Sequence, residues 1–128
     1  MTYQEILQNP EVNALLEKGN QNLGLLGYTD HSRIHCAQVA HTAARILAAF
    51  GYPERDVELA RIAGYLHDIG NAINRTHHAE YGGLLANQIL RDTDLSIQDR
   101  VTIISAISNH DELSLIHISE PTRQAEIS

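Results

Sequence analysis

The sequence predicts an all-α domain. Apolar residues recur at helical spacing along almost the whole chain, and no segment of four or more residues alternates apolar and polar side chains as a half-buried strand would. Helix-start and helix-stop residues, such as Asn9-Pro10 and Gly51, separate the chain into about six such stretches. A chain of 128 residues is long enough to form one domain around one core.

The first two helices are expected close to the N-terminus. Thr2 and Glu5 form the pattern of a capping box, which predicts a short first helix. Asn9 supplies an N-cap and the next residue is a first-turn proline, so a second helix is expected over residues 10–26. Two internal glycines weaken this second helix.

Two apolar helices are expected next. Asp30 is the predicted N-cap of the third helix and Gly51 its end, while Pro53 opens the fourth helix and Gly70 follows its last turn. The residues predicted to face inward are Ile34, Ala37, Val39, Ala40, Ala44, Ile46 and Leu47 on the third helix, and Val57, Leu59, Ala60, Ile62, Ala63 and Leu66 on the fourth.

Two further helices complete the predicted bundle. A polar connection over residues 71–76 leads to a fifth helix over residues 77–90. The sixth helix is expected over residues 97–110, where Ser96 is the N-cap and Asp99 occupies the capping-box position.

The charge balance limits the classes of partner. Nine Lys and Arg residues stand against sixteen Asp and Glu residues, which gives a net charge of −7. Such a surface argues against non-specific nucleic-acid binding through phosphate charge, but a bound metal could still hold a small phosphorylated substrate. We find no membrane span and no signal peptide, and the single cysteine, Cys36, fits a reducing compartment, so we expect a cytoplasmic protein. The sequence also leaves open whether the protein forms a homodimer.

The last part of the chain does not look like natural protein sequence. The eleven residues LSLIHISEPTR, from Leu113 to Arg123, read as the translation of a transposase-type sequencing adapter. We therefore expect residues 1–112 to be the natural domain and residues 113–128 to be an adapter-derived tail. The chain as printed is then expected to be impaired, because helices beyond Glu112 would be missing.

Histidine is unusually frequent, and most of the histidines are clustered along the sequence. Apart from one histidine in the expected tail, seven are present, and Asp68 and Asp111 each directly follow one of them. Imidazole and carboxylate are together the ligand set of first-row metals such as Mn, Fe, Co, Ni and Zn. No HExxH or CxxC motif is present, which excludes the common zinc-protease and zinc-ribbon patterns. The seven are His31, His35, His41, His67, His77, His78 and His110.

Four histidine-containing elements follow one another at helical positions: H-C-A-Q-V-A at 35–40, A-G-Y-L-H-D-I-G-N at 63–71, H-A-E-Y-G-G at 78–83 and A-I-S-N-H-D at 106–111. Together they resemble the HD-domain metal-dependent phosphohydrolases, over about residues 28–112. The resemblance implies an all-α HD-domain bundle that is incomplete at its C-terminus, with one or two divalent metal ions and a metal-activated water that attacks a phosphate ester.

The same resemblance implies roles for individual residues. It makes His67 and Asp68 the catalytic doublet, and it adds three histidines to them as metal ligands. It also leaves one departure, because the distal Asp of the family should lie on a later helix and Asp111 is too close to its neighbouring histidine. The implied metal ligands are His35, His67, Asp68, His78 and His110. Beside the resemblance, the loop cation Arg75 is a candidate phosphate clamp by charge and position, and His31 and His77 are further candidates for substrate contact.

Two other functions stay open on the sequence. Some five-histidine relatives in this superfamily look like di-iron oxygenases, and imidazole and carboxylate suit iron as well as manganese. A non-catalytic sensing or partner-binding module that keeps a structural metal would show the same ligand types. His31 could equally cap the start of its helix, and Arg75 could be a solvated loop residue.

Overall fold

The computed structural model describes residues 1–25 and 33–110, and their fold is all-α, as predicted. Six α-helices and one short 3-10 helix make up this part of the chain, which contains no strand. The elements are α1 (Tyr3–Leu7), α2 (Pro10–Leu25), α3 (Arg33–Ala49), α4 (Glu54–Leu66), η1 (Ile69–Ala72), α5 (His78–Leu90) and α6 (Ile97–Ser108).

The helix starts follow the predicted caps. Thr2 and Glu5 form the full capping box at α1, because each side chain accepts a hydrogen bond from the backbone amide of the other. The side-chain oxygen of Asn9 accepts from a backbone amide in the first turn of α2 at 3.0 Å. Ser96 accepts from the amide of Asp99 at 3.1 Å at the start of α6. These local signals therefore predict the helix starts correctly.

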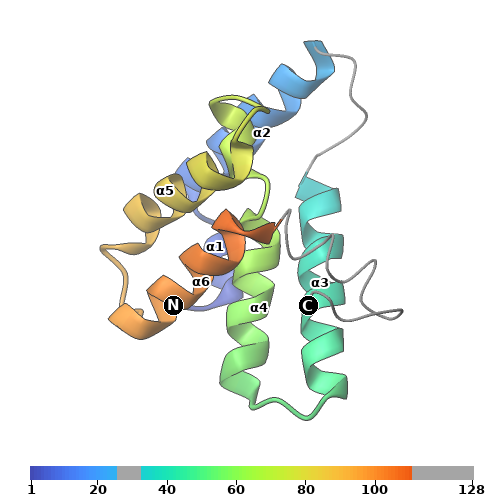
Figure 1. Ribbon diagram of the computed structural model, residues 1–128, viewed down its shortest axis with the longest axis vertical. Coiled ribbons are helices and arrows are strands. Elements are labelled where there is room, and N and C mark those ends of the chain that lie inside the picture. Colours follow the sequence, from blue (N-terminus) through green and yellow to red (C-terminus); the bar gives the residue numbers. More distant parts are fainter. Residues whose placement is uncertain (26–32, 111–128) are drawn as a thin grey trace.

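The helices pack as two pairs (Figure 1). α3 and α4 lie side by side and are joined by a short loop, α5 and α6 form a second pair, and α2 packs against η1. Small residues let α3 and α4 approach closely, since a Cβ added to Gly64 would lie 2.9 Å from the Cα of Ala40. The core is built from Tyr3, Ile6, Val12, Leu16, Cys36, Ala40, Leu59, Ile62, Tyr65, Leu66, Ile69, Ala86, Ile89, Leu90, Leu95, Ile103 and Ile107.

The inward face of α3 is narrower than predicted. Cys36, Ala40 and Ala44 are buried and lie four residues apart, so they form a single stripe along the helix. Ile34 is 71% exposed and Ile46 is 53% exposed, so the prediction that both face inward is wrong for the described part of the protein. The stripe is narrow because α4 is the main neighbour of α3 there.

The polar connection predicted over residues 71–76 is shorter in the structure, since only residues 73–76 lie outside a helix. Residues 69–72 form η1, and Asn71 within it is 2% exposed. Gly70 does not end a helix through a left-handed backbone, since Gly51 is the only described glycine with positive φ. Instead, Gly70 allows η1 to touch α5: a Cβ there would lie 1.8 Å from the carbonyl oxygen of His78.

Two helix ends differ from the prediction. α6 ends at Ser108 rather than at residue 110, and α5 begins at His78. His77 precedes α5 with a left-handed backbone, φ 61°, which is uncommon for a residue other than glycine. α2 is described as far as Leu25, and the predicted cap Asp30 lies outside the described residues. None of the helices over 1–25 and 33–110 has the length and apolarity needed to cross a bilayer.

Candidate metal centre

Two groups of imidazole and carboxylate side chains meet where α4 ends, and they share Asp68. His35 and His67 complete the first group, and His78 and His110 complete the second. Within each group, one ligand atom from each residue lies within 4.8 Å of the others. The fold therefore brings together all five residues predicted as metal ligands, from α3, the end of α4, the start of α5 and the end of α6.

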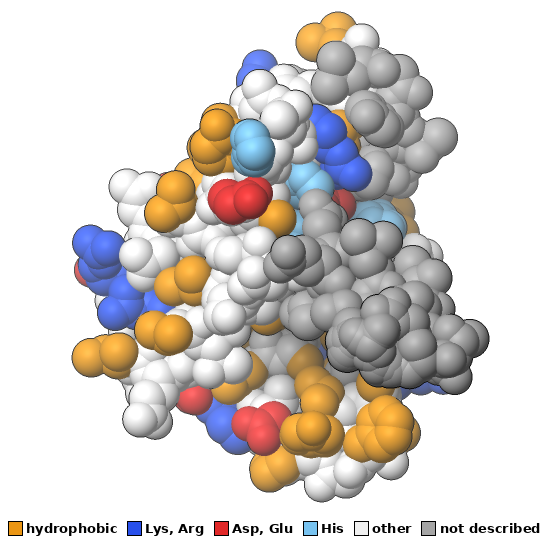
Figure 2. Space-filling model, viewed as in Figure 1, with side chains coloured by type: hydrophobic (Ala, Val, Ile, Leu, Met, Phe, Trp, Pro, Cys, Tyr) orange, Lys and Arg blue, Asp and Glu red, His pale blue; other side chains and the backbone are white. Residues whose placement is uncertain are grey.

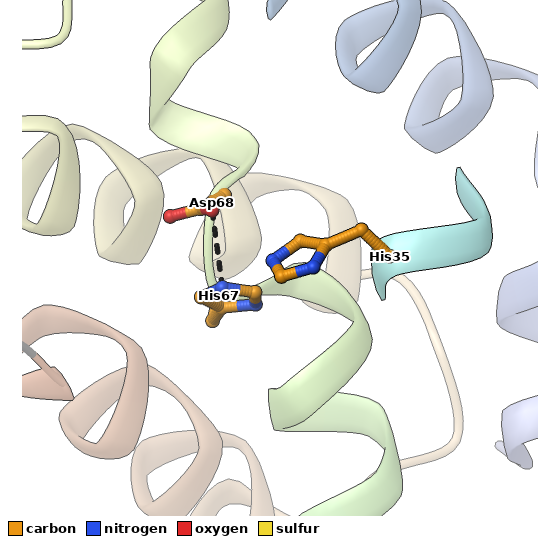
Figure 3. Close-up of side chains that lie close together, drawn as sticks. All are labelled: His35, His67 and Asp68. Carbon is orange, nitrogen blue, oxygen red and sulfur yellow. Dashed lines mark ion pairs between the residues drawn. The ribbon is translucent and has the colours of Figure 1, made fainter. Parts of the chain in front are cut away.

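The end of α4 allows two adjacent side chains to converge. His67 is the C-cap of α4, and Asp68 is the N-cap of η1. His67 Nε2 lies 3.1 Å from Asp68 Oδ2, and Figure 3 shows this contact together with His35, which reaches the site from α3. The ring centroids of His35 and His67 are 5.7 Å apart. Neighbouring residues in an unbroken helix point about 100° apart, so the helix end is what makes the shared site feasible.

The second oxygen of Asp68 faces the other two histidines. Oδ1 of Asp68 lies 3.3 Å from Nε2 of His78 and 3.7 Å from Nε2 of His110. The two Nε2 atoms lie 3.2 Å from each other. Each carboxylate oxygen therefore faces a different histidine group.

Backbone carbonyls orient the rings of His67, His78 and His110. The Nδ1 atoms of His67, His78 and His110 lie 2.7, 3.0 and 2.7 Å from the carbonyl oxygen three residues earlier in each case. A carbonyl oxygen only accepts, so each Nδ1 carries the hydrogen. In the neutral ring this leaves the lone pair on Nε2, the atom that points into the site and would bind a metal. In a protonated ring Nε2 also carries a hydrogen, which it donates to Asp68 when no metal is bound.

Burial and hydrogen bonding set the charge of Asp68. Its side chain is 7% exposed, and the neighbouring His78 is also buried. Burial alone would raise the pKa of Asp68, but hydrogen bonds and positive charge from His67 and His78 outweigh it and lower the pKa far below its ordinary value. Asp68 is therefore a carboxylate at every physiological pH, as a metal ligand must be.

These residues fit a divalent transition metal. Imidazole nitrogen and carboxylate oxygen are its usual donors, and the carbonyl contacts behind the rings are the supports that metal-bound histidines commonly have. The same donors suit Mn, Fe, Co, Ni and Zn, so they do not select one of these ions. Figure 2 shows histidine side chains reaching the surface of this face beside positively charged side chains.

The three residues predicted to contact substrate have different positions. Arg75 lies at the edge of the centre: its NH1 is 3.9 Å from Asp68 Oδ1 and donates to the side-chain oxygen of Asn71 at 3.4 Å. His77 is exposed, belongs to neither group, and lies 4.0 Å from its neighbour Glu80. His31 lies outside the described residues.

Sequence reasoning gives Asn71 no role at this site. The sequence predicts it as the first residue of a polar connection, but its side chain is buried and accepts a hydrogen bond from Arg75. A weak signal was present, because Asn71 directly follows His-Asp-Ile-Gly and has apolar residues beyond it.

Comparison with known proteins identifies the family pattern. The family model described as HD domain matches residues 33–127, which covers most of the chain. The match runs past residue 112, so the predicted domain boundary there stays a prediction. No solved structure matches the chain.

Two curated proteins of Methanocaldococcus jannaschii are similar to the chain. Uncharacterized protein MJ1020 is 28% identical over 134 residues, which covers 88% of this chain and 52% of that protein. Uncharacterized protein MJ0778 is 39% identical over 74 residues, which covers 56% of this chain and 40% of that protein. The chain thus spans about half the length, or less, of these relatives.

Proposed function

This chain belongs to the HD-domain family, and on that basis we propose that it is a metal-dependent phosphohydrolase that cleaves the phosphate ester of a nucleotide or another small phosphorylated molecule. The main support is the position of Asp68, which belongs to both groups: one carboxylate oxygen lies beside His67 and the other beside His78 and His110. A carboxylate shared in this way is suited to hold two cations close together.

The proposed roles follow from the contacts at the centre. His35 and His67 would hold one ion and His78 and His110 a second, with Asp68 between them. Bound divalent ions supply two things: they lower the pKa of water towards neutrality, and they neutralise charge on phosphoryl oxygens.

The protein side chains contribute orientation and charge. The carbonyl contacts behind three rings keep each Nε2 aimed at the centre, so little reorganisation is needed when the site fills. Asp68 stays ionised because its pKa is held low. The guanidinium of Arg75, at the edge of the centre, would donate hydrogen bonds to a phosphoryl oxygen.

The proposal also accounts for an acidic protein that binds an anionic substrate. The net charge of −7 is spread over the whole chain, whereas cations at Asp68 and the guanidinium of Arg75 are concentrated at one point. Local charge dominates at contact distance because salt screens charges farther than about 8 Å.

A screen of the metal-loaded protein tests this function. The full-length protein, with its natural sequence beyond Glu112, is loaded separately with Mn, Fe, Co, Ni and Zn and offered phosphomonoesters, phosphodiesters and nucleotides. His41→Ala is the control because His41 is exposed and lies outside both groups. We expect hydrolysis of at least one class with at least one metal, in both proteins.

The same screen separates the alternatives. Oxygen consumption by the iron-loaded protein, without phosphate release from any class, would favour the di-iron oxygenase, since iron accepts the same donors. Metal binding with neither activity would favour the non-catalytic module. Either result would reject the phosphohydrolase.

A further inference from the structure

We propose that Asn71 is a positioning residue that holds the guanidinium of Arg75 beside Asp68, where it receives a phosphoryl oxygen. The assignment of the ligand as phosphate rests on the proposed function. The contact itself is direct: Arg75 NH1 donates to Asn71 Oδ1 at 3.4 Å and lies 3.9 Å from Asp68 Oδ1.

The burial of Asn71 calls for an explanation. It is 2% exposed, and in the described part of the chain the only other buried polar or charged side chains are Asp68 and His78, both in the metal centre. Its Nδ2 has no hydrogen-bond partner among the described residues. An unpaired buried amide lowers stability, and an apolar side chain of similar size would avoid that cost. An apolar side chain at this position would, however, lose the hydrogen bond to Arg75, and this bond explains why an asparagine is buried here.

Residues of helix α2 pack closely against Asn71 and bond its backbone. Gly19 faces it without a side chain, and a Cβ there would lie 3.1 Å from the Cβ of Asn71. From the next turn, Asn22 Nδ2 donates to the backbone carbonyls of Asn71 and Ala72 at 3.0 and 3.2 Å. These contacts fix the backbone of η1, so the direction of the Asn71 side chain is set by residues far away in the sequence.

A fixed acceptor has a defined effect on Arg75. Its side chain is 32% exposed and long, so ordering it for each binding event would cost rotamer entropy. A guanidinium carries five N–H donors in a planar fork, which allows it to bond Asn71 and a phosphoryl oxygen at the same time. The bond to Asn71 therefore orders Arg75 in advance and improves phosphate binding.

A double-mutant cycle with inorganic phosphate as the probe tests this role. Phosphate affinity is measured by titration calorimetry on the metal-loaded full chain and on Asn71→Ala, Arg75→Ala and the double variant. We expect Arg75→Ala to weaken phosphate binding about tenfold or more, and Asn71→Ala to weaken it several-fold. In the double variant, loss of Asn71 should add almost nothing, because its effect acts through Arg75.

Asn13→Ala is the matched control. Asn13 lies in α2, its Oδ1 is likewise buried without a hydrogen-bond partner in the described chain, and its Nδ2 donates to the carbonyl of Leu7. We expect this variant to keep the wild-type phosphate affinity. Metal content is measured for every variant and should stay unchanged. If Asn71→Ala does not fold, Asn71→Ser replaces it, since its shorter side chain does not reach Arg75.

The possible results are distinguishable. Additive effects in the cycle, an unchanged affinity in Asn71→Ala, or a metal-loaded wild type that binds no phosphate would each overturn the positioning role. A coupled effect on phosphate binding in a protein that hydrolyses no phosphoester would support Asn71 as a positioning residue while rejecting the hydrolase.

Discussion

The Nε2 atoms of His78 and His110 lie 3.2 Å apart, although one histidine begins α5 and the other follows α6. Each ring donates its Nδ1 hydrogen to a backbone carbonyl, so two neutral rings would face each other with lone pairs. That arrangement is unfavourable unless a proton or a metal ion lies between the nitrogens. Asp68 Oδ1 borders the same space.

Asp68→Asn should remove metal from both groups. The substitution keeps the size of the side chain but removes the charge that the two groups share. We expect metal content, measured by mass spectrometry after desalting, to fall from one or two equivalents to nearly none. His41→Ala is the control and should retain the wild-type content. Full metal content in Asp68→Asn would show that the ions bind elsewhere.

A substitution in one histidine group should leave the metal of the other group bound. His35 belongs to the first group and His110 to the second, so each alanine variant leaves one group intact. If the wild type binds two ions, each variant should retain one; if it binds a single ion, only one of the variants should lose it. The number of metal sites in each variant is measured by titrating metal in a calorimeter. Loss of every ion in both variants would contradict two separable groups.

Metal should stabilise the fold, and the stabilisation should decrease at acidic pH. A metal present at about 100 times its Kd adds about 2.7 kcal/mol, which raises Tm by about 10 °C in a domain of this size. Histidines bind metal when neutral, so the shift in Tm should shrink as the pH is lowered from 8 to 5. Asp68 does not contribute to this change, because its low pKa keeps it ionised. Thermal melts with metal and with chelator, from pH 5 to pH 8, measure the shift. A shift that stays constant over this range would exclude histidine ligands.

Gly70→Ala should damage both the fold and the centre. The new Cβ would lie 1.8 Å from the carbonyl oxygen of His78 and 2.6 Å from the amide nitrogen of Gly82, so η1 and α5 would have to separate. We expect a loss of about 3 kcal/mol or more in the free energy of unfolding by denaturant. Gly24→Ala is the matched control, since nothing lies within 4 Å of its added Cβ and it lies in α2. It should be neutral or stabilise by up to about 1 kcal/mol. Equal effects of the two substitutions would contradict the close contact.

Local signals predict most of the helical framework. The capping residues Thr2, Asn9 and Ser96 act within three residues of themselves, so their role can be predicted without the fold. The exposure of Ile34 and Ile46 could not be predicted in the same way. Their apolar character is visible in the sequence, but whether a second helix covers them depends on how α3 packs against α4.

The candidate centre was predicted in part, by resemblance rather than by spacing. The five ligand candidates come from segments up to 75 positions apart, and helical periodicity alone does not place His35 beside His67. Asn71 was missed because its burial depends on Gly19 and Asn22 in α2. The positions and burial of these site residues therefore depend on contacts between distant segments, which a local sequence pattern does not predict.

Anomalous diffraction from crystals of the metal-loaded protein tests the central claim most directly. Data collected at the absorption edge of the loaded metal locate each ion independently of any assay. We predict one or two peaks within coordination distance of a carboxylate oxygen of Asp68, each also bounded by His35 and His67 or by His78 and His110. Peaks only at other places on the protein, or ordered crystals with no peak although the protein binds metal in solution, would contradict a metal centre shared through Asp68.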